Sequence, residues 1–518
     1  MITHPRSDSP SCAECDAGAA RAAVDSPHVA LGDNRAVVSP EMSLTSGSLA
    51  NGSQKFIHTF VYLDGIVGGE GLAVEVAMAV RRGIRWFVRH GLVRRTMQRQ
   101  MRTGDLGARL MMDPAIREDP FPYYEELREQ GRLVTTGLAL MSAHHDVCQA
   151  VLRSPDFGQL RLDMLPGILR LGMKIGGRPV LGPIEPPSML VADPPEHTRY
   201  RKLVTRAFSA RAIAAMRPRV EQIAEELLDE IARSASAGPT VDLVARYASL
   251  LPATVIAEML GAPVTMRRQF LDWGAGAALS LDVGLSYRDF RRSERDIAAL
   301  HRWMLGHFDE LRRAPRDGVL SALVTAHDQG DQLTLDELSS IAMLVLGAGF
   351  ETTVNLLGNG AVLLMQHRDQ LDLLRTQPHR WPGAVDEILR YDSPVQRTGR
   401  VALRDTEVVG HRVRAGSLII ALLGGANRDP AVFADPHRFD IQRPQADRSL
   451  AFSSGIHYCI GAALARMEGE VGLQALFRRF PDLTLAGVPH RRPTRVLRGY
   501  DAIPVRPVIG SPARCPAR

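Results

Sequence analysis

One cysteine, Cys459, stands where its chemistry could be used. It lies between Gly455 and Gly461, where an irregular loop turns into a helix. The free N–H groups and positive dipole end of a helix N-terminus favour the thiolate, the form of cysteine that binds metals. The glycines let the backbone approach a flat ligand closely or adopt positive φ. A cysteine taken alone is more often a small buried hydrophobic residue, so this local pattern leaves both roles open.

A second chemical pattern, Ala348-Gly349-Phe350-Glu351-Thr352-Thr353, lies within a long apolar stretch. Glycine in a helix interior costs about 1 kcal/mol relative to alanine, and the Thr352 hydroxyl can bond back to the preceding turn. Together they can loosen a helix and leave a groove for a small molecule. Thr352 could instead be an ordinary core residue, but the Glu351 carboxylate would be costly there without a function or a partner. We therefore predict a functional site in this helix.

The elements that carry these residues are mostly helical. Thr334 and Glu337 form a capping box, and the run from 338 to 364 is apolar on almost every face, which predicts a helix crossing the interior. Trp381-Pro382 opens a shorter helix that Asp392-Ser393-Pro394 ends.

The chain beyond Pro394 changes character. Short β-like pieces punctuated by glycine occupy residues 395–423, and a loop rich in Asp and Pro follows from 427 to 444. A final helix is expected from about 460 to 480, closed by Pro481. The predicted fold class is mainly α with a minor sheet.

The N-terminal part divides at Met78. Residues 1–77 have the composition of a disordered or weakly ordered extension, and 78–518 are expected to form a single domain. Residues 81–111 predict a basic amphipathic helical run, for which packing on the body of the protein is favoured over docking to a membrane or partner. A Cys12/Cys15 pair in the extension is more simply a chance pair than a metal or redox site.

Composition and charge exclude several classes. The 518 residues carry 63 Lys+Arg and 57 Asp+Glu, with no basic block of nucleic-acid type. No window reaches the roughly 18 uninterrupted apolar residues of a membrane span, and the best, 56–80, contains Asp64, Glu70 and Glu75. Five scattered cysteines without a secretory signal indicate a reducing cytoplasm.

The stretch around Cys459 resembles the cytochrome P450 family, whose signature is F-x-x-G-x-H-x-C-x-G. The match is complete at Phe452, Gly455, His457, Cys459 and Gly461, and Ser453 stands where a glycine is common. The resemblance covers roughly residues 113–518. It implies a triangular-prism fold, heme b, and Cys459 as the axial ligand of the heme iron.

The same resemblance assigns roles elsewhere in the chain. Residues 348–353 look like the oxygen-activation motif, with Thr352 and Glu351 as the catalytic pair that manages protons. Glu387 and Arg390 resemble the E-x-x-R pair, and Arg438, in Pro-His-Arg-Phe, resembles the arginine that completes a structural ionic cluster. His197, Arg201, Arg400 and His457 fall at positions that bind the heme propionates. Further heme contacts are implied for Phe452, Gly455, Gly461, Ala348 and Gly349.

The function implied is that of a monooxygenase. It would use dioxygen and two electrons from NAD(P)H, delivered by a ferredoxin and its reductase, because the chain shows no flavin or iron–sulfur motif. The substrate would be an apolar small molecule hydroxylated or epoxidised in a pocket that includes Leu344, Ala348, Val395 and residues 157–190. The chain looks most similar to soluble actinobacterial members, in particular the mycobacterial-type family 140, and we expect a monomer.

Two alternatives stay open on the sequence. One is a heme-thiolate peroxygenase or isomerase, against which the Glu351-Thr352 pair argues, and the other is a non-catalytic heme sensor. An acidic ferredoxin is expected to dock on the Cys459 side of the heme, on a basic patch drawn from Arg448, Arg466, Arg199, Lys202 and Arg206, although these could be ordinary surface residues of an arginine-rich protein.

Overall fold

The long apolar helix expected in the middle of the chain is α15 (Leu335–Gln366). It is seen in a computed structural model that describes residues 70–160, 164, 167–235, 240–316, 318–328 and 333–508. The predicted capping box is present: the Thr334 hydroxyl accepts from the Glu337 amide at 3.3 Å, and the Glu337 carboxylate accepts from the Thr334 amide at 2.8 Å. In the described chain α15 alone is long and apolar enough to cross a membrane, and 78% of its most apolar window is buried inside the fold.

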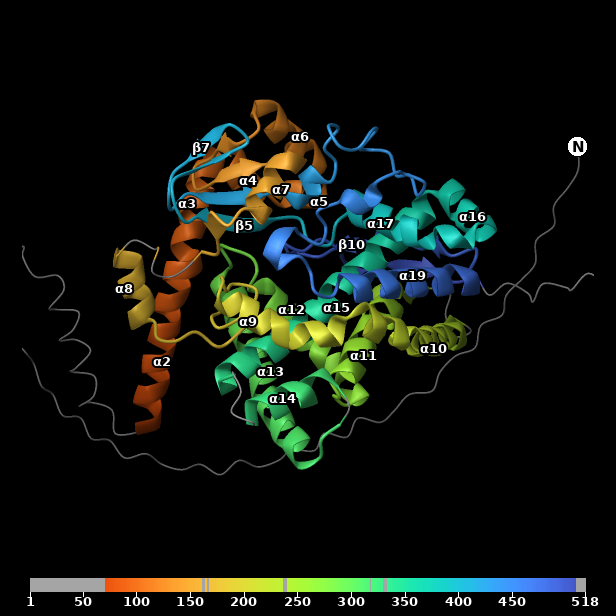
Figure 1. The fold of residues 1–518 in the computed structure, drawn as a ribbon, viewed down its shortest axis with the longest axis horizontal. Helices are drawn as coiled ribbons and strands as arrows, with labels where there is room; N and C mark the ends of the chain where they lie inside the picture. Colours follow the sequence, from red (N-terminus) through yellow and green to blue (C-terminus); the bar gives the residue numbers. More distant parts are fainter. Residues whose placement is uncertain are drawn as a thin grey trace, which may run out of the picture. The chain divides into compact units, whose positions relative to one another are not determined.

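Other helices pack around α15 (Figure 1). On its sides lie α11 (Leu250–Met259), α12 (Arg267–Leu279), α13 (Tyr287–Arg313) and α19 (Ala462–Arg479). α19 approaches closely because Gly472 faces α15: a Cβ there would lie 2.8 Å from Leu357 and 2.9 Å from Leu251. The outer helices of this half are α10 (Ala210–Ala235), α14 (Val319–Asp328), α16 (Arg368–Thr376) and α17 (Trp381–Tyr391).

The sheets are small, as predicted. The largest has the order β1-β2-β8-β5-β3, from β1 (Val134–Thr135), β2 (Leu140–Ser142), β3 (Phe157–Gly158), β5 (Thr398–Ala402) and β8 (Leu418–Ala421). β5 and β8 are antiparallel with Arg400 opposite Ile419. The others join β6 (Thr406–Val408) to β7 (His411–Val413), β10 (His490–Arg491) to β11 (Tyr500–Ala502), and β4 (Val241–Asp242) to β12 (Pro504–Arg506) and β9 (Thr484–Leu485). The strands predicted between 395 and 423 are therefore confirmed.

The predicted basic helical run is also confirmed, and it packs on the fold. It comprises α2 (Glu70–Trp86), a π-helical turn (Phe87–Gly91), α3 (Leu92–Arg102) and α4 (Leu106–Met112). Arg85 is buried and hydrogen-bonds Glu294 of α13 at 2.8 Å, and the Trp86 indole donates to the Leu285 carbonyl at 3.0 Å. α2 begins before the boundary expected at Met78, and the rest of the predicted extension, with Cys12 and Cys15, lies outside the described residues.

The remaining short helices carry or flank the site. They are α5 (Pro114–Glu118), α6 (Phe121–Gln130), α7 (His145–Arg153), α8 (Gly167–Ile175), α9 (Glu196–Thr205) and α18 (Leu423–Ala426).

Candidate active site

Cys459 precedes α19 by one short turn, and its side chain is exposed. The protein packed around the other sides desolvates the thiol and raises its pKa, while a hydrogen bond from the Gly461 amide and the charges of Arg201 and Arg466 lower it. The Cys459 amide itself donates to the Phe452 carbonyl at 3.0 Å. The sulfur is thus held by its backbone, with one open side for a cation that would stabilise the thiolate.

The loop before Cys459 depends on unusual backbone conformations. Gly455 has φ +70°, and a Cβ at this position would lie 2.3 Å from the Leu152 carbonyl oxygen of α7. Ser453 also has positive φ, at 64°. A non-glycine residue with positive φ costs about 1 kcal/mol. Glycine therefore suits position 455. The loop therefore packs closely against α7, and its conformation depends on a glycine at position 455.

The middle of α15 has an accessible surface although the helix is otherwise buried. Ala348 is exposed and Gly347 and Gly349 are half-buried, whereas Leu346 and Phe350 are buried. The Thr352 hydroxyl donates to the Ala348 carbonyl at 3.1 Å. The predicted back-bond is thus present, and it lies beside the accessible stretch that was expected as a groove.

Glu351 has a partner. Its carboxylate is buried and ion-paired with Arg492, and the Arg492 Nε donates to the Tyr500 carbonyl at 2.9 Å. Burial lowers the pKa of Arg492 from its ordinary value. The positive charge of Arg492 compensates the carboxylate of Glu351 inside the fold. Arg492 also connects α15 to the β10–β11 segment.

Four cationic or titratable side chains gather near the cysteine loop. The rings of His197 and His457 lie 4.3 Å apart, and the Arg201 guanidinium donates to the Tyr458 carbonyl at 2.7 Å. Arg400 is buried and donates to the Thr398 hydroxyl and the Gly399 carbonyl. Burial and the neighbouring cations lower the pKa of His457 to about 3, and burial lowers that of Arg400 to about 10.

Not every polar atom of these four side chains has a hydrogen-bond partner. The buried His197 Nε2 has no hydrogen-bond partner. Arg201 donates to a backbone carbonyl, and the charge of Asp193 raises the pKa of Arg400 against the larger, opposite effect of burial. A buried cation that is only partly compensated, as Arg400 is, is costly, so the group is suited to receive an anion.

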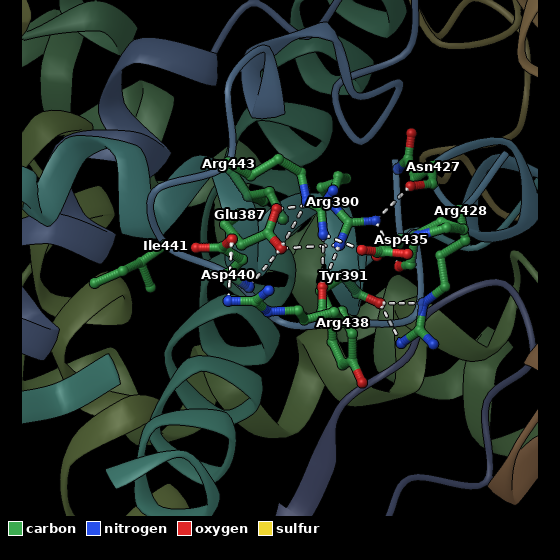
Figure 2. Close-up of polar contacts among 12 residues, drawn as sticks. Glu387, Arg390, Tyr391, Asn427, Arg428, Asp435, Arg438, Asp440, Ile441 and Arg443 are labelled. Atoms are coloured by element: carbon green, nitrogen blue, oxygen red, sulfur yellow. Dashed lines mark hydrogen bonds and ion pairs between the residues drawn. The ribbon is translucent and has the colours of Figure 1, made fainter. Parts of the chain in front are cut away.

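A buried ionic cluster anchors the loop that leads to Cys459 (Figure 2). Arg390 donates to both carboxylate oxygens of Glu387, at 2.7 and 2.8 Å, and neither side chain has exposed surface. Arg390 also reaches the carbonyls of Asn427 and Pro436 at 2.9 and 3.0 Å. Glu387 and Arg390 therefore form the predicted pair, and Arg390 joins α17 to the loop.

The predicted third member of this cluster is wrong. The Arg438 side chain is 65% exposed and its nearest acid is Asp440, at 3.7 Å. Arg443 takes the place instead: its Nε lies 3.2 Å from Glu387 Oε1, and its side chain is 7% exposed. Arg438 contributes its carbonyl, which accepts from Arg443 at 2.7 Å. The loop turns between the two positions, so the later arginine points inward.

Comparisons with known proteins agree with this geometry. Residues 382–494 match the family model described as Cytochrome P450. The chain is 48% identical to the Mycobacterium tuberculosis protein named cytochrome P450 140 over 426 residues, which cover 82% of this chain and 97% of that protein. The chain belongs to the cytochrome P450 family. Its enzyme class is therefore that of the oxidoreductases called monooxygenases, and the expected likeness to family 140 is confirmed.

Two further likenesses are informative for this cytochrome P450. It is 44% identical to 6-deoxyerythronolide B hydroxylase of Saccharopolyspora erythraea over 62% of this chain and 78% of that protein. The crystal structure of Mycobacterium smegmatis CYP164A2 superimposes with a TM-score of 0.70 at 34% identity, covering 77% of this chain and 99% of that one. The predicted fold, mainly helical with a small β-region, is confirmed.

The residues of this cytochrome P450 fit a heme. Cys459 offers an exposed sulfur, and Ala348 offers an exposed surface on the buried helix α15. The unpartnered His197 nitrogen and the guanidinium groups of Arg400 and Arg201, which donate to backbone carbonyls, suit the two propionates. Phe452 and Gly461 flank the sulfur, and a Cβ on Gly461 would lie 3.9 Å from it.

The residues predicted to line a substrate pocket differ in exposure. Ala348 is exposed and Val395 is half-buried, with a backbone bridge from Val395 to Leu497. Leu344 is 7% exposed and belongs to the hydrophobic core, so it offers little surface. In the segment 157–190, β3 is buried, and α8 exposes Ile168, Leu171 and Ile175.

The five basic residues predicted for ferredoxin docking separate into two groups. Arg199 is ion-paired with Glu337, and Arg466 with Asp386 at 2.8 Å, so acids neutralise both. Lys202, Arg206 and Arg448 are exposed. These three are the members still suited to attract an acidic partner.

Three functional candidates were missed from the sequence: Arg443, Arg492 and Glu468. Glu468 on α19 is fully buried, one of its oxygens has no hydrogen-bond partner, and burial raises its pKa to about 8. The carboxyl neighbours Thr353 of α15. A charged residue on an apolar helix face was the available signal for Glu468, whereas nothing local distinguishes Arg443 or Arg492 from other arginines.

Proposed function

We propose that this cytochrome P450 holds heme b through Cys459 and hydroxylates or epoxidises an apolar small molecule. The observation that carries the proposal is the exposed, backbone-held Cys459 sulfur beside the guanidinium groups of Arg201 and Arg400 and the unpartnered His197 Nε2. When bound, the heme supplies the activation of dioxygen that monooxygenation requires, and a thiolate ligand favours O–O cleavage.

The protein's own residues have distinct tasks in this proposal. The Gly461 amide and the nearby arginines stabilise the Cys459 thiolate. His197, Arg201, Arg400 and His457 bind the two propionates and orient the ring. Ala348 and Gly349 provide the surface of α15 against which it lies.

Thr352 and Glu351 transfer protons in this proposal. The Thr352 hydroxyl bonds to the Ala348 carbonyl at 3.1 Å, next to the accessible part of the helix, where it can pass a proton to a small molecule in the groove. Glu351 takes up a proton from solvent, passes it to Thr352 and so returns to the carboxylate that pairs with Arg492.

Electrons come from a ferredoxin and its NAD(P)H-dependent reductase in the cytoplasm, in this proposal. Lys202, Arg206 and Arg448 form the exposed basic surface that an acidic ferredoxin recognises. The pocket bordered by Ala348 and Val395 takes the substrate. A screen for the heme spin-state change on adding compounds identifies its class.

The test of the central assignment is a matched pair of cysteine variants. Cys459→His is expected to fold and to lose the red-shifted carbon-monoxide spectrum of the reduced thiolate-ligated heme. Cys148→Ala is the control, because Cys148 is buried and burial raises the pKa of its thiol to about 12. An unchanged spectrum in Cys459→His places the ligand elsewhere. Steady NAD(P)H and dioxygen consumption with product formation separates an enzyme from a heme sensor.

A further inference from the structure

A cleft rich in arginine lies between the N-terminal helices and the segment that joins β10 to β11. It is open to solvent, and α4, α5, α6 and residues 491–499 supply most of its walls. Six of its lining residues are Arg117, Arg397, Arg491, Arg492, Arg495 and Arg498. Asp113 is the single carboxylate in the described lining, and one oxygen of Asp113 caps α5.

Three of these arginines are matched by acids. Arg491 and Arg498 share Asp392, at 3.0 and 2.7 Å, and Arg492 pairs with Glu351. Asp392 is buried, and the arginines around it hold the pKa of its carboxyl below the ordinary value. Two carboxylates thus hold these three guanidinium groups in place, and this part of the lining keeps one positive charge in excess.

The side chains of the other three arginines form no ion pair shorter than 3.9 Å in the part of the chain that the structure describes. Arg397 is 7% exposed, donates to the carbonyls of Leu110 and Arg495 at 3.2 and 2.8 Å, and leaves its Nε without a partner. Arg495 donates to the Val283 carbonyl at 3.2 Å. Arg117 reaches Glu118 only at 3.9 Å and also has an unpartnered Nε.

Asp282 is a buried acid whose charge acts on both Arg397 and Arg495, and it also accepts hydrogen bonds from the backbone. Its two oxygens accept from the backbone amides of Arg495 and Val496 at 2.9 Å each. Burial lowers the pKa of Arg495; the charge of Asp282 opposes this effect, and the charges of Arg397 and Arg117 add to it. Guanidinium groups gathered in this way repel one another and bind carboxylate or phosphate with paired hydrogen bonds.

We propose that this cleft binds one oxyanion, the phosphate or carboxylate group of a ligand, between Arg117, Arg397 and Arg495. The side chain of Leu497 lines the cleft, and the backbone of Leu497 pairs with that of Val395. A ligand held here by its acidic group therefore lies next to a residue expected in the substrate pocket. The anion has two possible sources, free phosphate or the acidic end of an organic molecule, and the inference does not depend on the proposed function.

The experiment measures anion binding to the heme-loaded full chain. Thermal unfolding and titration calorimetry are followed with inorganic phosphate, acetate and decanoate, at an ionic strength kept constant with sodium chloride because screening alone changes exposed charge interactions. The variants are Arg117→Gln and Arg495→Gln, whose side chains are half-buried, and the matched control is Arg412→Gln on the exposed side of β7.

Binding is expected to be saturable and to weaken about tenfold or more in each cleft variant, as loss of one charge-assisted hydrogen bond requires. Arg412→Gln should bind as the unmodified chain does. Saturation by phosphate alone identifies a phosphate-bearing ligand, and saturation by acetate or decanoate identifies a carboxylate. Absence of saturable binding for all three anions, or equal binding by the cleft variants and the control, overturns the proposal. If Arg495→Gln does not fold, Arg117→Gln decides, and neither readout needs catalytic turnover.

Discussion

The Nε atom of Arg443 lies 3.2 Å from Oε1 of Glu387, inside the cluster that supports the Cys459 loop. Arg443 also donates to the carbonyls of Asp435 and Arg438, at 3.0 and 2.7 Å. A single guanidinium thus joins α17 to two points of the loop (Figure 2).

Removing this guanidinium should destabilise the protein. Arg443→Ala is expected to lower the free energy of unfolding by about 2 to 3 kcal/mol, since Glu387 keeps Arg390 but loses one buried partner. Arg438→Ala is the control and should change it by less than about 0.5 kcal/mol, because that side chain is exposed. Denaturant unfolding and heme content measure both. Equal effects of the two substitutions would restore Arg438 to the cluster.

Thr352→Ala should uncouple electron use from product formation. The substitution removes the hydroxyl beside the accessible part of α15 and leaves the basic docking surface intact. NAD(P)H consumption is expected to continue while product per NAD(P)H falls roughly tenfold and peroxide rises. Thr353→Ala serves as the comparison, because its hydroxyl bonds back to Gly349 within the core. Parallel loss of consumption and product in Thr352→Ala would make Thr352 a core residue.

Glu468 should make stability depend on pH. Burial raises the pKa of its carboxyl from 4.5 to about 8 in the folded chain, so between these values the folded state holds a proton that the unfolded state has released. The free energy of unfolding therefore falls as pH rises through this window. Glu468→Gln should remove that component, with a gain over the unmodified chain of up to a few kcal/mol at the upper end. A stability difference that is constant between about pH 4.5 and about pH 8 would contradict the assignment.

Reversing the exposed basic charges should slow reduction by ferredoxin. The double change Lys202→Glu and Arg206→Glu is expected to lower the rate about tenfold at low salt, with a smaller effect as ionic strength rises. Arg412→Glu on β7 provides a control for a single charge reversal, and the single change Lys202→Glu is compared with it directly. Reduction by dithionite should be unaffected in all three proteins. If the rate of reduction by ferredoxin depends neither on the substitutions nor on salt, the ferredoxin docks elsewhere.

Much of this protein was predictable because its determinants are local in sequence. The capping box of Thr334 and Glu337, the proline opening of α17 and the glycine-flanked Cys459 each depend on neighbours within a turn or two. Spacing along one helix likewise placed Arg390 on the same face as Glu387. Hydrogen bonds and φ preferences act over such short distances, so a sequence window contains their whole cause.

Long-range partners were decided only by the tertiary structure. Arg438 and Arg443 are alike in type and both follow α17, and only the turn of the loop selects which one reaches Glu387. The Arg492 partner of Glu351 comes from far along the chain, as does the gathering of Arg117, Arg397 and Arg495 around one cleft. The sequence alone determined which chemical groups are present and which helices carry them. Which arginines find an acid depended on packing between distant segments, because burial and distance set the strength of a charge interaction and neither is a property of local sequence.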